Sequence, residues 1–170
     1  LNSTLSVGGK TLIIRALSVS ERSSRKWLTR FRLEYKDAVT PKTLIYKDVR
    51  ELMNYLLQKR YLLAVCSNKP EYLVKKTLCD TDLLKYFSII IGGNSNSPPK
   101  PNPERILTCI QKMNVELDQA IFIGDSSLDQ EASFNAGIEF IFFRGGYDDG
   151  VNKNYLLNSF KSHRELFDLF

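Results

Sequence analysis

The chain has 170 residues, which is enough for one domain with a substantial hydrophobic core. Hydrophobic residues make up 43% of the chain and charged residues 25%, a composition that excludes a largely disordered protein. The net charge is +5, but Lys and Arg are spread along the chain and form no long run. This distribution favours a solvated surface over a nucleic-acid-binding face.

The cysteines and the apolar runs predict a cytoplasmic protein. Cys66, Cys79 and Cys109 are odd in number, widely spaced and without a CxxC pair, which argues against a disulfide framework or a zinc site. The apolar runs are short and interrupted, so no membrane-spanning helix is predicted. The first ten residues lack the pattern of a signal peptide. Because the chain starts at Leu1 without an initiator Met, we expect a processed or truncated product.

The first sixty residues have helical patterns. Apolar residues recur at helical spacing between residues 10 and 39 and predict two helices. A serine-rich stretch at residues 18–24 separates them, with Ser20 or Ser23 as the expected N-cap of the second. Pro41 interrupts the pattern, and residues 47–60 then predict a strongly amphipathic helix.

From residue 61 onward, short apolar runs alternate with helical patterns. Strands are predicted at residues 61–67, 86–93, 120–125 and 138–146, and helices at 71–79, 103–114, 127–137 and 162–170. Apolar runs separated by helices are typical of a parallel sheet that is covered on both faces. The sequence therefore predicts an α/β fold with a doubly wound parallel sheet, whose functional residues lie beyond the carboxyl ends of the strands.

Two of these strand ends are followed by polar residues that could hold an anion. Ser67 and Asn68 follow the first strand and offer a hydroxyl, an amide and free backbone N–H groups. The alternative is an ordinary turn capped by these two side chains. Lys100 lies in the Pro-rich loop at residues 94–103, where flanking prolines restrict its backbone. Its alternative is a solvated loop lysine.

The end of the third strand combines a glycine with two carboxylates. Gly124 permits a tight turn, Asp125 stands at the tip of the strand, and Asp129 follows one helical turn later. Both carboxylates can therefore face the same point, an arrangement that suits a hard cation such as Mg²⁺. The alternative is that Asp125 or Ser126 serves as a helix N-cap.

The order of these features resembles the haloacid dehalogenase (HAD) superfamily, and within it the branch of the phosphoglycolate phosphatases. The segments LLAVCSNKP, PPKPNPE and IFIGDSSLDQEASFNAG are similar to the second, third and fourth motifs of that branch, and RGGYDDG to its Gly-Tyr loop. The resemblance implies a HAD-like, Rossmannoid core over residues 43–170. It also implies that residues 1–42 form part of a helical cap.

The resemblance further implies a Mg²⁺-dependent phosphatase that hydrolyses small phosphate monoesters through an aspartyl-phosphate. Ser67 and Lys100 would then be catalytic, and Ser67, Asn68 and Lys100 would bind the phosphoryl group of the substrate. Asp125 would bind Mg²⁺, and Asp129 would be a second ligand or would orient its neighbours. The expected partner is a small phosphorylated metabolite such as phosphoglycolate, with no nucleic acid and no membrane.

The sequence departs from the family at its first motif. No segment ahead of Ser67 has the form of an apolar strand followed by Asp-x-Asp-x-Thr, which carries the nucleophile in the family. Asp80-Thr81-Asp82 follows a helical segment and is interpreted as a turn between helices. We therefore expect weak Mg²⁺ binding and little or no activity from this chain. A missing central strand would also leave unpaired sheet edges, through which the chain could form oligomers.

Two other functions stay open. The chain could be a non-catalytic HAD-like module that binds an anion or a protein partner. It could also bind nucleic acid through the basic residues between 22 and 36, although a solvated face of a cap helix explains them better.

Overall fold

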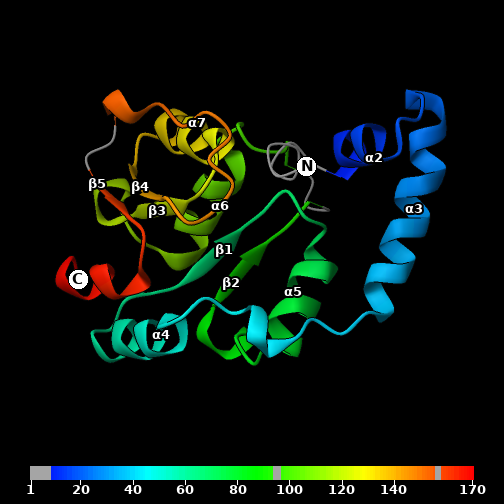
Figure 1. Cartoon of the computed structure of the whole chain (residues 1–170). Helices are drawn as coiled ribbons and strands as arrows, with labels where there is room; N and C mark the ends of the chain where they lie inside the picture. The colour runs from blue at the N-terminus through cyan, green and yellow to red at the C-terminus, as the bar shows by residue number, and fades with distance from the viewer. Residues whose placement is uncertain (1–8, 94–96, 156–157) are drawn as a thin grey trace.

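The computed structural model describes residues 9–93, 97–155 and 158–170, and divides them into a helical pair and an α/β core (Figure 1). The pair consists of α2 (Gly9–Leu17) and α3 (Glu21–Asp37), which lie at one side of the core. In the part of the chain that the structure describes, no helix has the length and hydropathy needed to cross a membrane.

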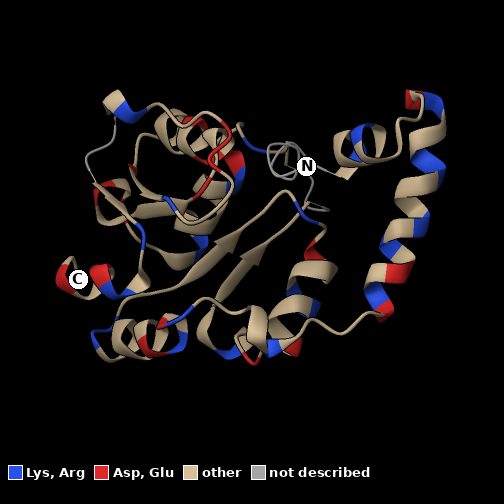
Figure 2. Ribbon diagram, in the orientation of Figure 1, with Lys and Arg blue, Asp and Glu red and all other residues tan. Residues whose placement is uncertain are grey.

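The turn between α2 and α3 confirms the predicted helix start. Ser20 is the N-cap of α3, and its side chain accepts a hydrogen bond from the backbone N–H of Ser23. Three apolar side chains of the predicted stripe on α3 remain exposed, namely Trp27, Phe31 and Leu33. Figure 2 shows Lys and Arg distributed along the whole of α3 with other residues between them. This helix therefore presents a mixed surface rather than a continuous basic one.

The core follows the predicted alternation of helices and strands. Its elements are α4 (Val49–Gln58), β1 (Ala64–Cys66), α5 (Glu71–Asp80), β2 (Ile89–Ile91), α6 (Glu104–Met113), β3 (Ile121–Gly124), α7 (Ser127–Ala136), β4 (Glu139–Phe143) and β5 (Asn158–Phe160). The strands are shorter than predicted, and β5 was not predicted because it lacks an apolar run. The last predicted helix is a 3-10 helix, η5 (His163–Asp168).

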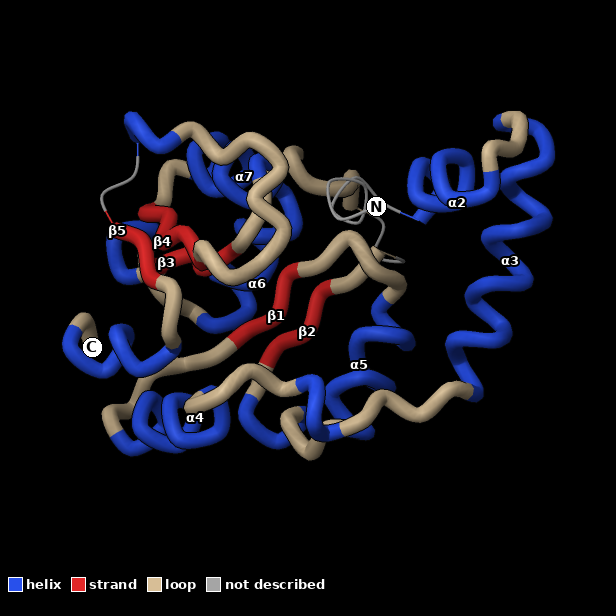
Figure 3. Tube along the Cα trace, viewed as in Figure 1, coloured by secondary structure: helices blue, strands red, loops and turns tan. Residues whose placement is uncertain are grey.

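All strand pairings are parallel, which confirms the predicted α/β fold. The described strands nevertheless form two separate sheets, β1-β2 and β3-β4-β5 (Figure 3). Among the described strands, β1 and β3 each have a single hydrogen-bonded neighbour, so both sheets have the unpaired edges that the missing first motif predicts. No described segment pairs with their second edges.

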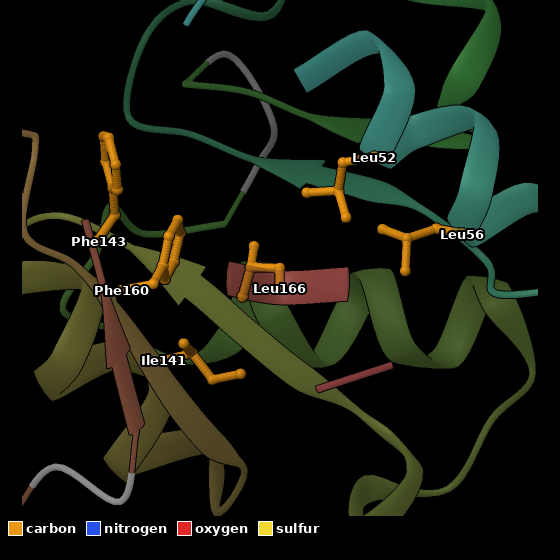
Figure 4. Packing of buried hydrophobic residues seen from close by; sticks show 6 residues of the cluster. All are labelled: Leu52, Leu56, Ile141, Phe143, Phe160 and Leu166. Carbon is orange, nitrogen blue, oxygen red and sulfur yellow. The ribbon is translucent and has the colours of Figure 1, made fainter. Parts of the chain in front are cut away.

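Helices cover both faces of the three-stranded sheet. On one face, α4 and η5 pack on β4 and β5 through a buried cluster (Figure 4) that comprises Leu52, Leu56, Ile141, Phe143, Phe160 and Leu166. On the other face, α6 and α7 bury Ile106, Ile110, Ala132 and Ala136. Along β3, however, Ile121 and Ile123 remain 42% and 39% exposed. Their exposure contrasts with the fully covered sheet that the apolar pattern predicts.

The Asp-x-Asp sequence lies at the junction of the helical pair with the core. Asp80 is the last residue of α5 and forms an ion pair with Lys76, while Asp82 forms one with Lys42. The backbone N–H of Thr40 also donates a hydrogen bond to the Asp80 carboxylate, over 2.9 Å. These contacts confirm that the segment is a turn, which joins α5 to η2 (Leu84–Tyr86).

Candidate active site

Lys100 connects the carboxyl ends of the two sheets. Its Nζ atom donates hydrogen bonds to the backbone carbonyl of Cys66, the last residue of β1, over 3.1 Å, and to Asp129 Oδ1 over 2.5 Å. Asp129 lies in the first turn of α7, which follows β3. The structure thus brings together the polar residues that follow β1 and β3, as expected for parallel strands.

Asn68 holds the loop that carries Lys100. Its Nδ2 atom donates to the backbone carbonyl of Lys100 over 3.1 Å, and its Oδ1 atom accepts from the backbone N–H of Lys100 over 2.8 Å. Both ends of the amide are therefore engaged with the backbone of this loop. The geometry gives Asn68 a role in positioning Lys100, while the substrate contact that the resemblance implies for Asn68 stays a prediction.

Arg105 supports the same region and was not among the predicted site residues. It is 3% exposed, and its guanidinium donates to the backbone carbonyls of Ser67 and Ser97 and to Asn68 Oδ1. Five donors in a planar fork can satisfy several carbonyls at once. One sequence signal could have identified it. A cation in the first turn of a helix interacts unfavourably with the helix dipole, so an Arg at this position indicates a function other than stabilising the helix.

Asp129 uses both of its carboxylate oxygens within the protein. Oδ1 accepts from Lys100, while Oδ2 accepts from the hydroxyl of Ser126 over 2.7 Å and from the backbone N–H groups of Asp125 and Ser126 over 3.2 Å each. Ser126 is the N-cap of α7, so the capping alternative for this residue is also present in the structure. These contacts make Asp129 an anchor for Lys100 and for the turn after β3.

Two glycines make room for the two carboxylates. A Cβ atom at Gly124 would lie 2.5 Å from the Cβ atom of Asp129, and one at Gly146 would lie 2.1 Å from Asp125 Oδ2. Real Cβ atoms do not approach other atoms so closely, so any larger residue would displace the carboxylates. Besides the tight turn predicted for it, Gly124 therefore leaves the space that the side chain of Asp129 occupies.

Asp125 is a partly buried carboxylate whose charge has no basic partner in direct contact. Its Oδ2 atom accepts one hydrogen bond, from the backbone N–H of Tyr147 over 3.2 Å. No Lys or Arg in the described ranges forms an ion pair with it. Burial raises the pKa of Asp125, and the negative charge of Asp129 raises it further. A cation at this position would relieve both effects.

Asp125 is the residue of this region that could serve as a ligand of Mg²⁺. In the described ranges, no group of three or more His, Cys, Asp or Glu side chains could hold a metal ion. Proteins often bind Mg²⁺ through only one or two carboxylates, with water and substrate phosphate as the other ligands. Asp125 could be such a ligand, whereas Asp129 is already bonded through both oxygens.

Ser67 presents a hydroxyl beside this centre. Its Oγ atom accepts a hydrogen bond from the backbone N–H of Lys69 over 3.1 Å, and Arg105 fixes its carbonyl. The Ser67 hydroxyl donates no hydrogen bond within the described ranges, so its proton can be donated to a bound anion. The carboxyl ends of β1 and β3 thus present a hydrogen-bond donor, a cation and a potential metal ligand, from Ser67, Lys100 and Asp125 respectively.

Comparison with known proteins identifies the family of the chain. The model of the haloacid dehalogenase-like hydrolase family matches residues 8–143. The chain belongs to this family. It is 30% identical over 155 residues to a phosphoglycolate phosphatase of Colwellia psychrerythraea, a match that covers 86% of this chain and 69% of that protein.

Solved structures of related HAD-like proteins show the same fold. A protein from Haemophilus somnus described as a predicted phosphoglycolate phosphatase superposes with a TM-score of 0.84 at 21% identity, over 99% of this chain and 80% of that one. The CbbY protein of Rhodobacter sphaeroides, solved with xylulose 1,5-bisphosphate, gives a TM-score of 0.75 at 19% identity, over 96% of this chain and 77% of that one.

Proposed function

We propose that the site binds the phosphoryl group of a small phosphate monoester together with Mg²⁺, as part of a HAD phosphatase. The observation that carries the proposal is the position of Lys100, whose Nζ atom bonds to the Cys66 carbonyl at the end of β1 and to Asp129 after β3. The name of the relative from Colwellia and the bisphosphate bound by the CbbY protein support a phosphorylated metabolite as the substrate. Phosphoglycolate is the first candidate.

The roles of the residues follow from their contacts. Ser67 donates its hydroxyl proton to a phosphoryl oxygen, and Lys100 offsets negative charge on the phosphate and on the transition state. Asn68 and Arg105 hold the backbone of these two residues in place. Asp125 is the residue that would hold Mg²⁺, which when bound offsets the repulsion between carboxylates and a phosphate dianion.

Hydrolysis in this family needs an aspartate nucleophile, and the chain offers no clear one. No Asp-x-Asp-x-Thr sequence precedes Ser67, and Asp80 and Asp82 are paired with Lys76 and Lys42 at the junction with the helical pair. We therefore expect this chain to bind phosphate monoesters with little or no turnover. A non-catalytic role in binding an anion is the second candidate function, and the lack of that motif favours it.

Titration calorimetry with 2-phosphoglycolate, in the presence and absence of Mg²⁺, tests the binding site. We expect Lys100→Met to abolish the binding heat, whereas Lys161→Met, which removes an exposed lysine of the core, should leave it unchanged. Unaltered binding by the Lys100 variant would overturn the proposal.

An assay with p-nitrophenyl phosphate and Mg²⁺ tests for turnover. Binding without turnover supports the non-catalytic role for this chain. Robust turnover that Asp125→Asn abolishes, but that substitutions of Asp80 and Asp82 leave unchanged, would establish an active phosphatase with a nucleophile elsewhere in the chain.

A further inference from the structure

Two cysteine side chains meet at the end of β1, next to Ser67 in the chain. Cys66 is the last residue of β1, and Cys109 lies in α6, which packs on β1. The Sγ atom of Cys109 lies 3.9 Å from the backbone carbonyl oxygen of Val65, and its thiol forms a hydrogen bond with the sulfur of Cys66. The two sulfur atoms are therefore neighbours across the interface between strand and helix. Neither thiol takes part in the phosphate site proposed above.

The two thiols differ in acidity. A hydrogen bond from Cys109 holds the pKa of the Cys66 thiol below its usual value, although burial acts in the opposite direction. The charges of Lys100 and Arg105 also favour the thiolate of Cys66, while that of Asp129 opposes it. The same hydrogen bond, together with burial, raises the pKa of the Cys109 thiol. Cys66 is therefore the nucleophile of the pair, and Cys109 is the thiol that can react with it in a second step.

A small oxidant can reach Cys66. This residue is partly exposed, whereas Cys109 is only 4% exposed. Both residues line a cavity of about 720 Å³ between β1 and β3. Because the share of liquid volume of one water molecule is about 30 Å³, the cavity has ample room for hydrogen peroxide, which is little larger than water. The exposed, more acidic thiol and the buried, less acidic one thus stand in the order that a two-step oxidation requires.

We propose that Cys66 and Cys109 form a reversible disulfide when the protein meets hydrogen peroxide, and that this disulfide weakens the phosphate site. The Cys66 thiolate attacks one oxygen of the peroxide, the O–O bond breaks and hydroxide leaves, so that Cys66 becomes a sulfenic acid. The sulfur of Cys109 then attacks that of Cys66, the S–O bond breaks and water leaves. Overall, two thiols and one peroxide molecule give one disulfide and two water molecules. Dithiothreitol reverses the step by thiol–disulfide exchange and is itself oxidised.

The disulfide acts on the site because both cysteines are attached to it. A disulfide bond is about 2.0 Å long, which is shorter than a hydrogen-bonded contact between two sulfur atoms, so oxidation must draw the end of β1 and α6 together. The backbone carbonyl of Cys66 accepts the hydrogen bond from Lys100 Nζ over 3.1 Å. Arg105, one turn before Cys109 on α6, holds the carbonyl of Ser67. Only the effect on binding rests on the proposed function; formation of the disulfide does not depend on it.

Mass spectrometry of the Cys79→Ser protein under non-reducing conditions tests the disulfide. This background removes the exposed third cysteine, which could link two chains. We expect equimolar peroxide to join the peptides that carry Cys66 and Cys109, with the loss of two hydrogen atoms, and dithiothreitol to release them. Folded protein that keeps both thiols, or that oxidises Cys66 to a sulfinic acid without forming the bond, would overturn the proposal.

A matched pair of variants assigns the roles of the two thiols. In the same background, Cys109→Ala leaves the sulfenic acid of Cys66 without its second thiol, so dimedone, which reacts with sulfenic acids, should label Cys66. The protein that retains both cysteines should be labelled at least tenfold less. Cys66→Ala should leave Cys109 unlabelled, because that thiol is buried and less acidic. Stronger labelling of Cys109 than of Cys66 would contradict the assignment of the nucleophile.

Calorimetry with 2-phosphoglycolate before and after oxidation tests the effect on the site. In the Cys79→Ser background, we expect oxidation to raise Kd at least tenfold and dithiothreitol to restore it, whereas the further change Cys109→Ala should prevent the rise. Amide hydrogen exchange of Lys100, whose N–H donates to Asn68, should also become faster on oxidation, and this measurement needs no ligand. Unchanged exchange at Lys100 in the oxidised protein would overturn the coupling. Failure of the reduced protein to bind would refute the proposed function alone, since the exchange of Lys100 would still decide the coupling.

Discussion

Lys100 Nζ lies 2.5 Å from Asp129 Oδ1, and the two side chains are only 11% and 9% exposed. Removing one member of a buried pair leaves the other charge without compensation, which costs about 3–5 kcal/mol. This relationship makes Lys100 both a binding residue and a determinant of stability, and the two roles can be separated by experiment.

We expect Lys100→Met and Asp129→Asn each to lower the free energy of unfolding by about 3 kcal/mol. The double variant should recover part of this loss, because it leaves no buried charge unpaired. Urea unfolding measures the stability, and calorimetry should show that neither single variant nor the double variant binds phosphoglycolate. Additive losses in the double variant would argue against direct coupling of the two residues.

Asp125→Asn should separate metal binding from stability. The pKa of Asp125 is raised in the folded protein, so its ionised form destabilises the fold at pH values above that pKa. This destabilisation disappears as the pH falls through the folded pKa and the carboxylate becomes protonated. The amide retains an acceptor for the Tyr147 N–H. We expect the variant to be more stable by about 0.5–1 kcal/mol near pH 7, a rise in melting temperature of about 1–4 °C, while Mg²⁺ binding is lost.

The pH dependence of the stability of Asp125→Asn tests the same explanation. Thermal unfolding measured between pH 3 and pH 8 should show the difference between Asp125→Asn and the unmodified chain shrinking toward low pH. A variant that is less stable than the unmodified chain at pH 7 would mean that the ionised carboxylate has a stabilising partner.

Gly146→Ala should damage the site without a conformational penalty at residue 146 itself. The new Cβ atom would lie 2.1 Å from Asp125 Oδ2 and would displace that carboxylate. We expect a loss of Mg²⁺ binding of at least tenfold by calorimetry. Gly137→Ala is the matched control, because Gly137 has a φ of +73° and open space around its Cα atom. The control should lose about 1 kcal/mol of stability and keep its ligand binding.

Protonation of His163 should lower the free energy of unfolding in mild acid. Its ring lies among those of Tyr46, Phe143 and Phe160, with centroid separations of 5.5, 4.8 and 5.4 Å. Burial lowers the pKa of His163 in the folded protein, although the charge of Asp48 acts in the opposite direction. The unfolded chain then binds the proton more tightly, so stability is complete above about pH 6.5 and declines as the pH falls through and below that value.

A His163→Phe variant tests this pH dependence. It should retain the aromatic packing and show a weaker decline in melting temperature between pH 7 and pH 5 than the unmodified chain. Identical pH profiles for the two proteins would show that other groups control stability in this range.

Local patterns predicted much of the fold because they depend on neighbours in the chain. The N-cap at Ser20, the end of α7 at Gly137 and the order of strands and helices from residue 61 are all confirmed. The three-residue strand β5 escaped prediction, because Asn158 and Ser159 have no apolar periodicity and pair with β4 only in the folded chain.

The candidate site was predictable to the same extent. Ser67 and Asp125 follow strands and Lys100 lies in a Pro-rich loop, so their types and order made them candidates. Arg105 gave little signal, because its importance comes from carbonyl groups of Ser67 and Ser97 that fold against it.

The amino-acid sequence alone was sufficient to predict an α/β fold, the alternation of its elements and the edge of the sheet at which polar residues gather, since these depend on local periodicity and on the geometry of parallel strands. It could not establish that Asp129 would hold Lys100 or that β1 and β3 would border a cavity. Contacts between distant segments depend on packing in three dimensions, which brings together residues that have no relation along the chain.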